Sequence, residues 1–354
     1  MKIALVYDRV NKIGGAERVL TVLHEIWPSA PLFTAVYHSD TAIWADNFEV
    51  VPSFLNCFPW ARQCHEFYPW LTPLAFESFD FGGFDLVISV ASADAKGIIT
   101  GPKTFHLNYC LTPTRYLWGK NVCYFPVATN LLKRWDLVAN KRPDGIISIS
   151  RTVQGRVRKY YGRESEIIYP PVDSDFFKTN NQAADNYFLI VSRLVAYKKI
   201  DIAIKAFNRL GWPLKIIGIG REMHRLRSLA QKNIEFLGQL TDEEVLGYYQ
   251  KCAALVFPGE EDFGLTPLEA QACGKPVLAY RGGGATETVI GGVTGEFFDE
   301  QTEGSLITGL KSIRVKGFNP KACRRNALKF GKERFKKEFK KAVEEKYQQW
   351  QKKS

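Results

Sequence analysis

Residues 259–280, GEEDFGLTPLEAQACGKPVLAY, contain the residue types best suited to bind a phosphate group. Thr266 and Pro267 predict that a helix starts here, with threonine as the N-cap and proline at the first helical position. The backbone amides of Gly264 and Leu265, together with the helix dipole, would then form an anion site suited to a diphosphate. A glycine at 264 also lets this backbone approach a ligand closely.

Two glutamates in the same stretch are candidate ligand-binding carboxylates. Glu261 lies in the loop before the predicted helix, where it could reach a polar ligand. Beside Glu260 and Asp262, it could instead belong to a solvated acidic loop. Glu269 follows Thr266 at the spacing of a capping box, so helix capping and ligand contact are two equally weighted alternatives for it.

Apolar strands and helical stretches alternate along the chain, so these residues should be positioned by parallel sheets. In the second half, strands are predicted at 187–193, 213–220, 234–238, 253–259, 275–280 and 295–299. A helix between two of them starts at Thr241, with Glu244 completing a capping box. In the first half, strands are predicted at 2–8, 85–90 and 145–150, and helices at 16–26 and 151–162.

The stretch YPPVDSDFFKTNNQAADN, residues 169–186, is predicted to separate two domains. Pro170 and Pro171 block a helix, and the residues after Phe177 are mostly polar. Two α/β domains joined in this way leave a cleft, which is the usual place for a ligand.

The second half resembles the retaining family 4 glycosyltransferases, which have the GT-B fold. Glu261 and Glu269, with seven residues between them, resemble the EX7E motif of that family. The segment VSRLVAYKKIDIAIKAF is similar to the one that, in the family, contacts the donor diphosphate, and it contains Arg193 and Lys198. IEFLGQLTDEEVLGYYQKCAALVFPG is similar to the segment that flanks the nucleotide base, and GGGATETV and GVTGEFF follow in the family's order. The five segments agree in order and spacing over residues 186–299.

The resemblance implies an α/β protein of the GT-B fold, with two Rossmann-like domains facing a central cleft. The expected parts are an acceptor-side domain at 1–170, a linker at 171–186, a nucleotide-sugar-binding domain at 187–330, and a basic C-terminal helix at 331–354 that crosses back to the first domain.

The resemblance also implies roles for individual residues. Glu261 is the expected catalytic residue and would hold the donor sugar. The expected donor-binding residues are Gly14, Gly15, Arg193, Lys198, Phe263, Gly264, Leu265 and Glu269, with Glu269 at the ribose. The family's reaction is front-face attack in which the leaving phosphate acts as the base. No metal or cofactor is expected, because Arg193 and Lys198 supply the positive charge. Asp173-Ser174-Asp175 spells a DxD metal motif, but it lies in the linker.

Segments of the first half, including HLNYCLTPTRYLW and RWDLVANKRPDGIISIS, are similar to a branch containing bacterial O-antigen and polysaccharide mannosyltransferases. This implies transfer of a hexose, with GDP-mannose as the first donor candidate, to a glycan or lipid-linked saccharide. The sequence departs from the family at Leu111, where many members carry a histidine; His106 is a different position. A non-catalytic sugar-nucleotide sensor or scaffold, and a sugar-nucleotide epimerase of the same fold, remain alternatives.

Composition narrows the function classes. The net charge is +11, but residues 311–354 carry 16 basic and 4 acidic residues, so the body is near neutral. A nucleic-acid partner is therefore not expected, whereas a basic tail suits an anionic membrane surface. The seven cysteines show no CxxC pair, which argues against a disulfide framework or a zinc site. The N-terminus reads as a strand, so a cytoplasmic protein is expected, with peripheral attachment to the inner face of the membrane as an option.

Two further surfaces have alternative interpretations. In the tail, Phe339, Val343, Tyr347 and Trp350 recur on one helical face, with lysines around them. Packing of this face on the protein is favoured about two to one over insertion into a lipid interface. Residues 54–76 are rich in aromatic residues and proline; they are expected in the core, or on a surface that meets lipid or sugar.

Overall fold

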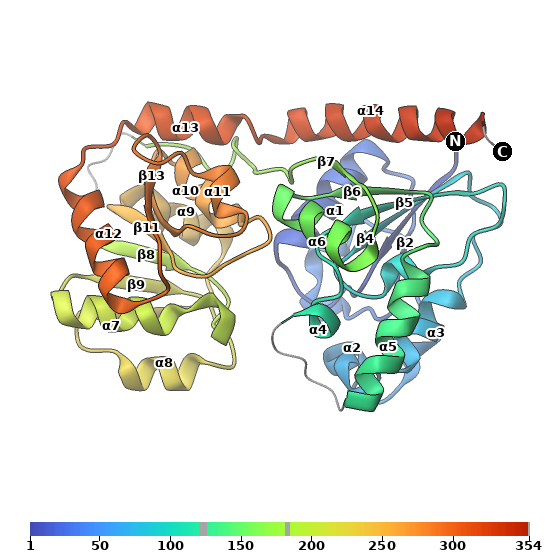
Figure 1. Cartoon of the computed structure of the whole chain (residues 1–354), viewed down its shortest axis with the longest axis horizontal. Coiled ribbons are helices and arrows are strands. Elements are labelled where there is room, and N and C mark those ends of the chain that lie inside the picture. The colour runs from blue at the N-terminus through green and yellow to red at the C-terminus, as the bar shows by residue number, and fades with distance from the viewer. Residues whose placement is uncertain (120–125, 181–184, 353–354) are drawn as a thin grey trace. The chain divides into compact units, whose positions relative to one another are not determined.

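The computed structural model describes residues 1–119, 126–180 and 185–352, and it divides into two compact units (Figure 1). Unit 1 contains Met1–Pro171 and the residues from Phe335 onward, and unit 2 contains Val172–Arg334. Each unit has its own parallel β-sheet covered by helices. The predicted α/β class with two parallel sheets is therefore confirmed.

Unit 1 contains a seven-stranded sheet in the order β3-β2-β1-β4-β5-β6-β7. Its strands are β1 (Ile3–Tyr7), β2 (Leu32–Thr34), β3 (Val50–Pro52), β4 (Leu86–Ala91), β5 (Phe105–Cys110), β6 (Gly145–Ser148) and β7 (Glu166–Ile167). Its helices are α1 (Gly15–Ile26), α2 (Ala61–Cys64), α3 (Leu71–Glu77), α4 (Arg115–Trp118), α5 (Pro126–Ala139) and α6 (Arg151–Tyr161). Short 3-10 turns are η1 (Ser39–Thr41), η2 (Ile43–Ala45), η3 (Phe54–Cys57), η4 (His65–Phe67) and η5 (Ala95–Gly97).

Unit 2 contains a six-stranded sheet in the order β10-β9-β8-β11-β12-β13. Its strands are β8 (Phe188–Val191), β9 (Leu214–Ile217), β10 (Ile234–Gly238), β11 (Ala254–Phe257), β12 (Val277–Tyr280) and β13 (Gly295–Phe298), all within the predicted ranges. Its helices are α7 (Ile200–Leu210), α8 (Met223–Leu229), α9 (Asp242–Lys251), α10 (Leu265–Ala272), α11 (Ala285–Thr288), α12 (Glu303–Val315) and α13 (Pro320–Leu328), with the turn η6 (Ala196–Lys198).

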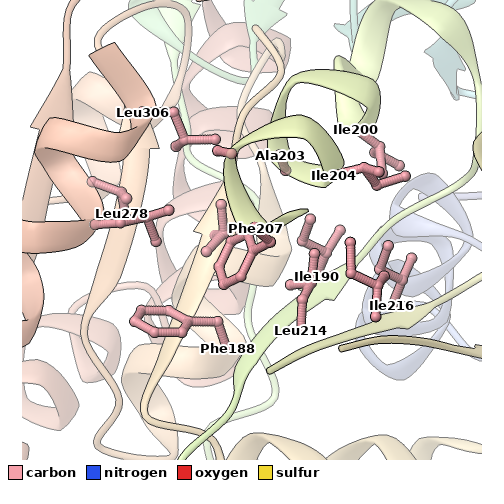
Figure 2. Close-up of a cluster of buried hydrophobic side chains, with 14 of the residues drawn as sticks. Phe188, Ile190, Ile200, Ala203, Ile204, Phe207, Leu214, Ile216, Leu278 and Leu306 are labelled. Carbon is pink, nitrogen blue, oxygen red and sulfur yellow. The ribbon is translucent and has the colours of Figure 1, made fainter. Parts of the chain in front are cut away.

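Two hydrophobic clusters hold the second sheet between its helices. Figure 2 shows one of them, in which side chains of β8 and β9 meet those of α7 and α12. Its labelled members are Phe188, Ile190, Ile200, Ala203, Ile204, Phe207, Leu214, Ile216, Leu278 and Leu306. The other cluster contains residues of α9, α10 and α13, including Tyr249, Ala270 and Ala327. Burial of these side chains is the main stabilising contribution to the unit.

Strand order creates a switch point in the second sheet. The chain runs from β8 to β9 on one side and later adds β11 on the other side of β8. Because all the strand pairs are parallel, the loops after β8 and β11 leave the same edge of the sheet in opposite directions. In open α/β sheets, ligands bind at this kind of position. Residues 192–199 and 258–264 form these two loops.

The stretch expected to be a linker is part of unit 2 from Val172 onward. Phe177 is fully buried and contacts the Tyr249 ring, with their centroids 5.8 Å apart. Asp173 forms an ion pair with Lys332, with 2.5 Å between Oδ2 and Nζ.

The C-terminal helix α14 (Lys332–Gln351) contributes its aromatic face to unit 1 from Phe335 onward. The ring centroid of Phe339 lies 5.3 Å from that of Tyr109, and the rings of Tyr347 and Trp350 contact Phe105. Two lysines of the helix form ion pairs in the same unit: Lys336 with Glu25 at 2.8 Å, and Lys346 with Glu166 at 3.1 Å. Among the residues described, no helix is long and apolar enough to cross a membrane.

Candidate functional site

Lys198 and Glu261 form an ion pair at the switch point of the second sheet. Lys198 ends η6 in the loop after β8, and Glu261 lies in the loop after β11. The side chains are only 10% and 22% exposed, so solvent screens this pair less than it would a surface pair. Two predicted site residues are thus held side by side, with opposite charges facing each other.

Glycines allow the loops around this pair to pack backbone against backbone. A Cβ at Gly259 would lie 2.9 Å from the Cα of Lys198, closer than real Cβ contacts. The amide of Gly284 donates to the carbonyl of Glu261 at 2.8 Å, which joins the GGG segment to the same loop. A side chain at either glycine would push the loops apart, so glycine is required for this arrangement.

Tyr197 contacts both predicted diphosphate-binding cations. Its hydroxyl accepts a hydrogen bond from Arg193 at 3.0 Å, and its ring centroid lies 5.3 Å from Lys198 Nζ. Lys199 then adopts a left-handed conformation with φ 55°, and α7 begins at the next residue. The tight turn therefore brings Arg193 to the hydroxyl of Tyr197 and Lys198 over its ring.

The start of α10 differs from the prediction. Gly264, not Thr266, is the N-cap, and its φ of 86° favours glycine. No side chain caps this helix. The predicted capping box between Thr266 and Glu269 is therefore wrong, because the helix starts earlier than the Thr-Pro signal indicated and Glu269 lies too deep in it. The predicted anion-binding amides of Gly264 and Leu265 still lie at the helix N-terminus.

Glu269 is 5% exposed, and its Oε2 accepts a hydrogen bond from the hydroxyl of Tyr249 at 2.9 Å. Of the two sequence-based alternatives, capping is excluded, and contact with a ligand remains a prediction. The Phe263 side chain is also buried, with its ring centroid 6.0 Å from that of Phe330. Contact of Phe263 with a ligand likewise remains a prediction.

Gly14 and Gly15 lie in unit 1, between β1 and α1. Gly14 is the N-cap of α1 and has an extended backbone conformation. In the first turn of α1, buried Glu17 accepts a hydrogen bond from Tyr7 at 2.6 Å. Contact of the two glycines with a donor remains a prediction.

Asp173, His106 and Leu111, which were not predicted as site residues, make structural contacts. Asp173 accepts from the backbone amide of Phe176 as well as pairing with Lys332. His106 is fully buried in β5, its Nε2 lies 2.8 Å from Ser89 Oγ, and burial lowers its pKa to about 3. Leu111 donates its amide to Ala91, which places it at the end of β5. No group of three or more metal-ligating side chains occurs among the described residues.

Tyr197 and Tyr249 were not predicted as site residues. Both belong to segments that resemble those of the family, but neither residue forms a motif with its neighbours in sequence. Tyr249 meets Glu269 only because α9 and α10 pack on the same face of the sheet. Such a contact between distant helices leaves no spacing signal in a single sequence.

Residues 171–330 match the family model of glycosyl transferases group 1. One curated relative is an uncharacterized glycosyltransferase of Methanocaldococcus jannaschii, which is 31% identical over 48% of this chain and 49% of the relative. Another is the GDP-mannose-dependent alpha-(1-6)-phosphatidylinositol monomannoside mannosyltransferase of Mycolicibacterium smegmatis, which is 29% identical over 53% of this chain and 56% of the relative. This chain thus spans about half the length of either relative. Among solved structures, the Anabaena protein HepE in complex with UDP-glucose has a TM-score of 0.74 at 18% identity, covering 98% of this chain and 100% of that one.

The two parallel sheets and the structural neighbours define the GT-B fold, as the sequence predicted. The second unit matches the model of the group 1 glycosyl transferases over residues 171–330, in agreement with the family that the sequence resembles.

Proposed function

We propose that the protein is a nucleotide-sugar-dependent glycosyltransferase whose donor binds at the carboxyl edge of the second sheet. The observation that carries this proposal is the Lys198–Glu261 pair at the switch point, inside the segment that matches the family model. A cation for a diphosphate and a carboxylate for sugar hydroxyls lie together there. The N-terminus of α10, which we expect to bind an anion, begins three residues after Glu261.

In the proposed reaction, the bond from the anomeric carbon to the diphosphate breaks, and a bond from that carbon to an acceptor oxygen forms with retained configuration. The acceptor proton passes to the leaving phosphate. Negative charge grows on the diphosphate, and Arg193, Lys198 and the amides at Gly264–Leu265 would stabilise it. Glu261 would orient the sugar, and Glu269 would accept a hydrogen bond from the ribose. In this scheme the cationic side chains do the work of a metal ion.

The donor proposed first is GDP-mannose. It is supported by the resemblance to mannosyltransferases and by the printed name of the Mycolicibacterium relative. A UDP-sugar is the second candidate, because the Anabaena neighbour contains UDP-glucose. The acceptor proposed is a glycan or lipid-linked saccharide of polysaccharide biosynthesis.

A weak association with the inner face of the membrane is also part of the proposal. Lys337, Lys340 and Lys341 of α14 are exposed, whereas its aromatic face is used within unit 1. Lysines near an anionic surface contribute about 1 kcal/mol each. A few of them could therefore hold a cytoplasmic enzyme close to a lipid-linked acceptor.

A thermal-shift screen tests the donor assignment. A ligand that binds only the native protein raises the melting temperature by mass action. We expect GDP-mannose or GDP to raise it more than UDP-glucose, UDP or the dTDP equivalents at equal concentration. A larger shift with the UDP compounds would favour the second candidate, and no shift with any nucleotide would contradict the proposed function.

A further inference from the structure

We propose that Tyr249 is a positioning residue that fixes the carboxylate of Glu269 for the donor ribose. This inference rests on the proposed function, because it takes the ligand of Glu269 to be a ribose hydroxyl. Its own observation is the buried hydrogen bond of 2.9 Å from the Tyr249 hydroxyl to Glu269 Oε2. Neither residue type nor spacing in the sequence links the two.

Tyr249 is held firmly as a donor. It is fully buried in α9, and its ring meets the Phe177 ring edge-on with centroids 5.8 Å apart. The capping box of Thr241 and Glu244 fixes the start of α9, as predicted from the sequence. A tyrosine ring enclosed in this way has few rotamers available, so the direction of its hydroxyl is set by packing.

The position of Glu269 also depends on how α10 is fixed within the unit. Gln271, on the same helix, donates to the carbonyl of Thr288 at 2.9 Å. Asn326 of α13 donates both to Gln271 at 2.7 Å and to Thr288 at 2.9 Å. The Gln271 and Asn326 side chains are almost fully buried, and with the backbone carbonyl of Thr288 they form a polar network inside the unit. This network connects α10, α11 and α13, and the hydrophobic cluster adds α9 to the same group of helices (Figure 1).

The hydrogen bond has a chemical consequence for the carboxylate. An ionised carboxylate only accepts hydrogen bonds, so the Tyr249 hydroxyl occupies an acceptor position of Oε2. With Oε2 directed at Tyr249, the orientation of the carboxylate plane is set before any ligand arrives. A ribose hydroxyl then meets an acceptor that needs little reorientation, which reduces the entropic cost of binding.

The test compares Tyr249→Phe with a matched control, Tyr187→Phe. Tyr187 belongs to the same hydrophobic cluster and donates its hydroxyl to the backbone carbonyl of Tyr248 at 2.9 Å, in a partly buried hydrogen bond. Both substitutions remove one tyrosine hydroxyl that donates a hydrogen bond within the unit, but only the Tyr249 hydroxyl bonds to Glu269. Calorimetric titrations with GDP and UDP, and with their 2′-deoxy and 3′-deoxy analogues, measure the selectivity for the ribose hydroxyls.

We expect the wild type to bind one ribonucleotide more tightly than its deoxy analogue. Tyr249→Phe should weaken binding of the ribonucleotide about tenfold. The ratio of the Kd of the deoxy analogue to that of the ribonucleotide should then be close to one. Tyr187→Phe should lower the melting temperature and keep the ratio. In a Glu269→Ala background, Tyr249→Phe should change affinity no further, because the two act as one unit.

Failure of the positioning role and failure of the proposed function give different results. If the wild type discriminates the deoxy analogue and Tyr249→Phe keeps the full ratio, the positioning role is overturned and the donor site stands. If the wild type binds no nucleoside diphosphate, the proposed function itself is overturned, and the positioning role with it.

Discussion

The side chains of Lys198 and Glu261, from separate loops, form an ion pair at the switch point of the second sheet. The resemblance to the family implies different ligand groups for them, the donor diphosphate for Lys198 and the donor sugar for Glu261. Without a ligand, each residue neutralises the other and keeps it in place. A donor must therefore enter beside an existing pair, and substitution of either residue changes the charge that the other presents.

Replacing Lys198 by alanine should weaken nucleoside diphosphate binding more than replacing Arg193. Lys198→Ala removes a cation and also leaves Glu261 as an unpaired negative charge near the diphosphate. The expected rise in Kd is about ten- to hundredfold, since hydrogen bonds to charged groups are worth about 1.5–3 kcal/mol. Calorimetric titration with GDP and UDP measures it. Lys205→Ala, at an exposed position on α7, is the matched control. Equal affinity in Lys198→Ala and the control would remove the assignment.

Glu261→Gln should have a different signature. Glutamine keeps the shape of the side chain and releases Lys198 from its partner, so the affinity for a nucleoside diphosphate should stay the same or rise. Turnover should fall steeply, because the sugar loses a charged acceptor. Glu235→Gln breaks a more exposed ion pair with Lys215 in the same unit and serves as the control. A parallel loss of affinity and turnover in Glu261→Gln would contradict the separation of roles.

Asp94 should make unit 1 less stable as the pH rises. Burial raises the pKa of this carboxyl to about 7, and Tyr116 donates a hydrogen bond to it at 2.7 Å. In an unfolded chain the pKa of this carboxyl would be about 3.9. Between these values the native state binds more protons than the unfolded state, so the free energy of unfolding falls as the pH rises from about 4 to 7.

Asp94→Asn removes this titration and keeps an acceptor for Tyr116. It should raise the melting temperature at pH 8 by a few degrees and reduce the difference between pH 5 and pH 8. Scanning calorimetry at the two pH values measures this, with the exposed Asp46→Asn in the same unit as the control. An unchanged pH dependence in Asp94→Asn would show that the carboxyl does not titrate as its burial implies.

The exposed lysines of α14 should bind anionic lipid without contributing to the core. Lys337→Glu combined with Lys340→Glu should reduce co-sedimentation with anionic vesicles at 0.1 M salt and leave the melting temperature nearly unchanged. Wild-type binding should fade at high salt, because the Debye length falls from about 10 Å at 0.1 M to about 3 Å at 1 M. Equal recovery with neutral and anionic vesicles would end the membrane proposal.

The matched control makes the same charge change in unit 2, with Lys205→Glu combined with Lys311→Glu at exposed positions. If this control lost as much binding as the α14 variant, net charge would explain the association, and α14 would have no special role.

Much of the second unit could be predicted from the sequence, because its strands are short apolar runs that end at glycine, proline or charged residues. The capping box at Thr241 and Glu244 was also predicted and is confirmed. In the first unit, β2, β3, β5 and β7 were not predicted. Strands of two or three residues are too short to show alternation. In β5, the buried His106 and Asn108 make the sequence of a central strand resemble that of a polar segment.

The candidate site was only partly predictable for a different reason. Spacing along the chain pointed to Glu261 and Glu269 as a pair, but the partners of both are elsewhere, at Lys198 and Tyr249. These contacts depend on how the loops and helices pack on the sheet. The capping error at Thr266 has a similar origin. Gly264 has a positive φ and lies close to the Phe257 ring, where a Cβ would be 2.8 Å from the ring, and this packing moves the start of the helix.

The most direct test of the central claim is release of nucleoside diphosphate from GDP-mannose, UDP-glucose and a dTDP-sugar, measured with and without saccharide acceptors. The account predicts that the wild type releases the nucleotide from one of these donors, with GDP-mannose first. Glu261→Gln should release it at least about 100-fold more slowly while still binding the nucleotide, a difference of about 2.7 kcal/mol in the barrier. Equal release by the wild type and Glu261→Gln would contradict the account, as would wild-type protein that binds the donors but never releases a nucleoside diphosphate.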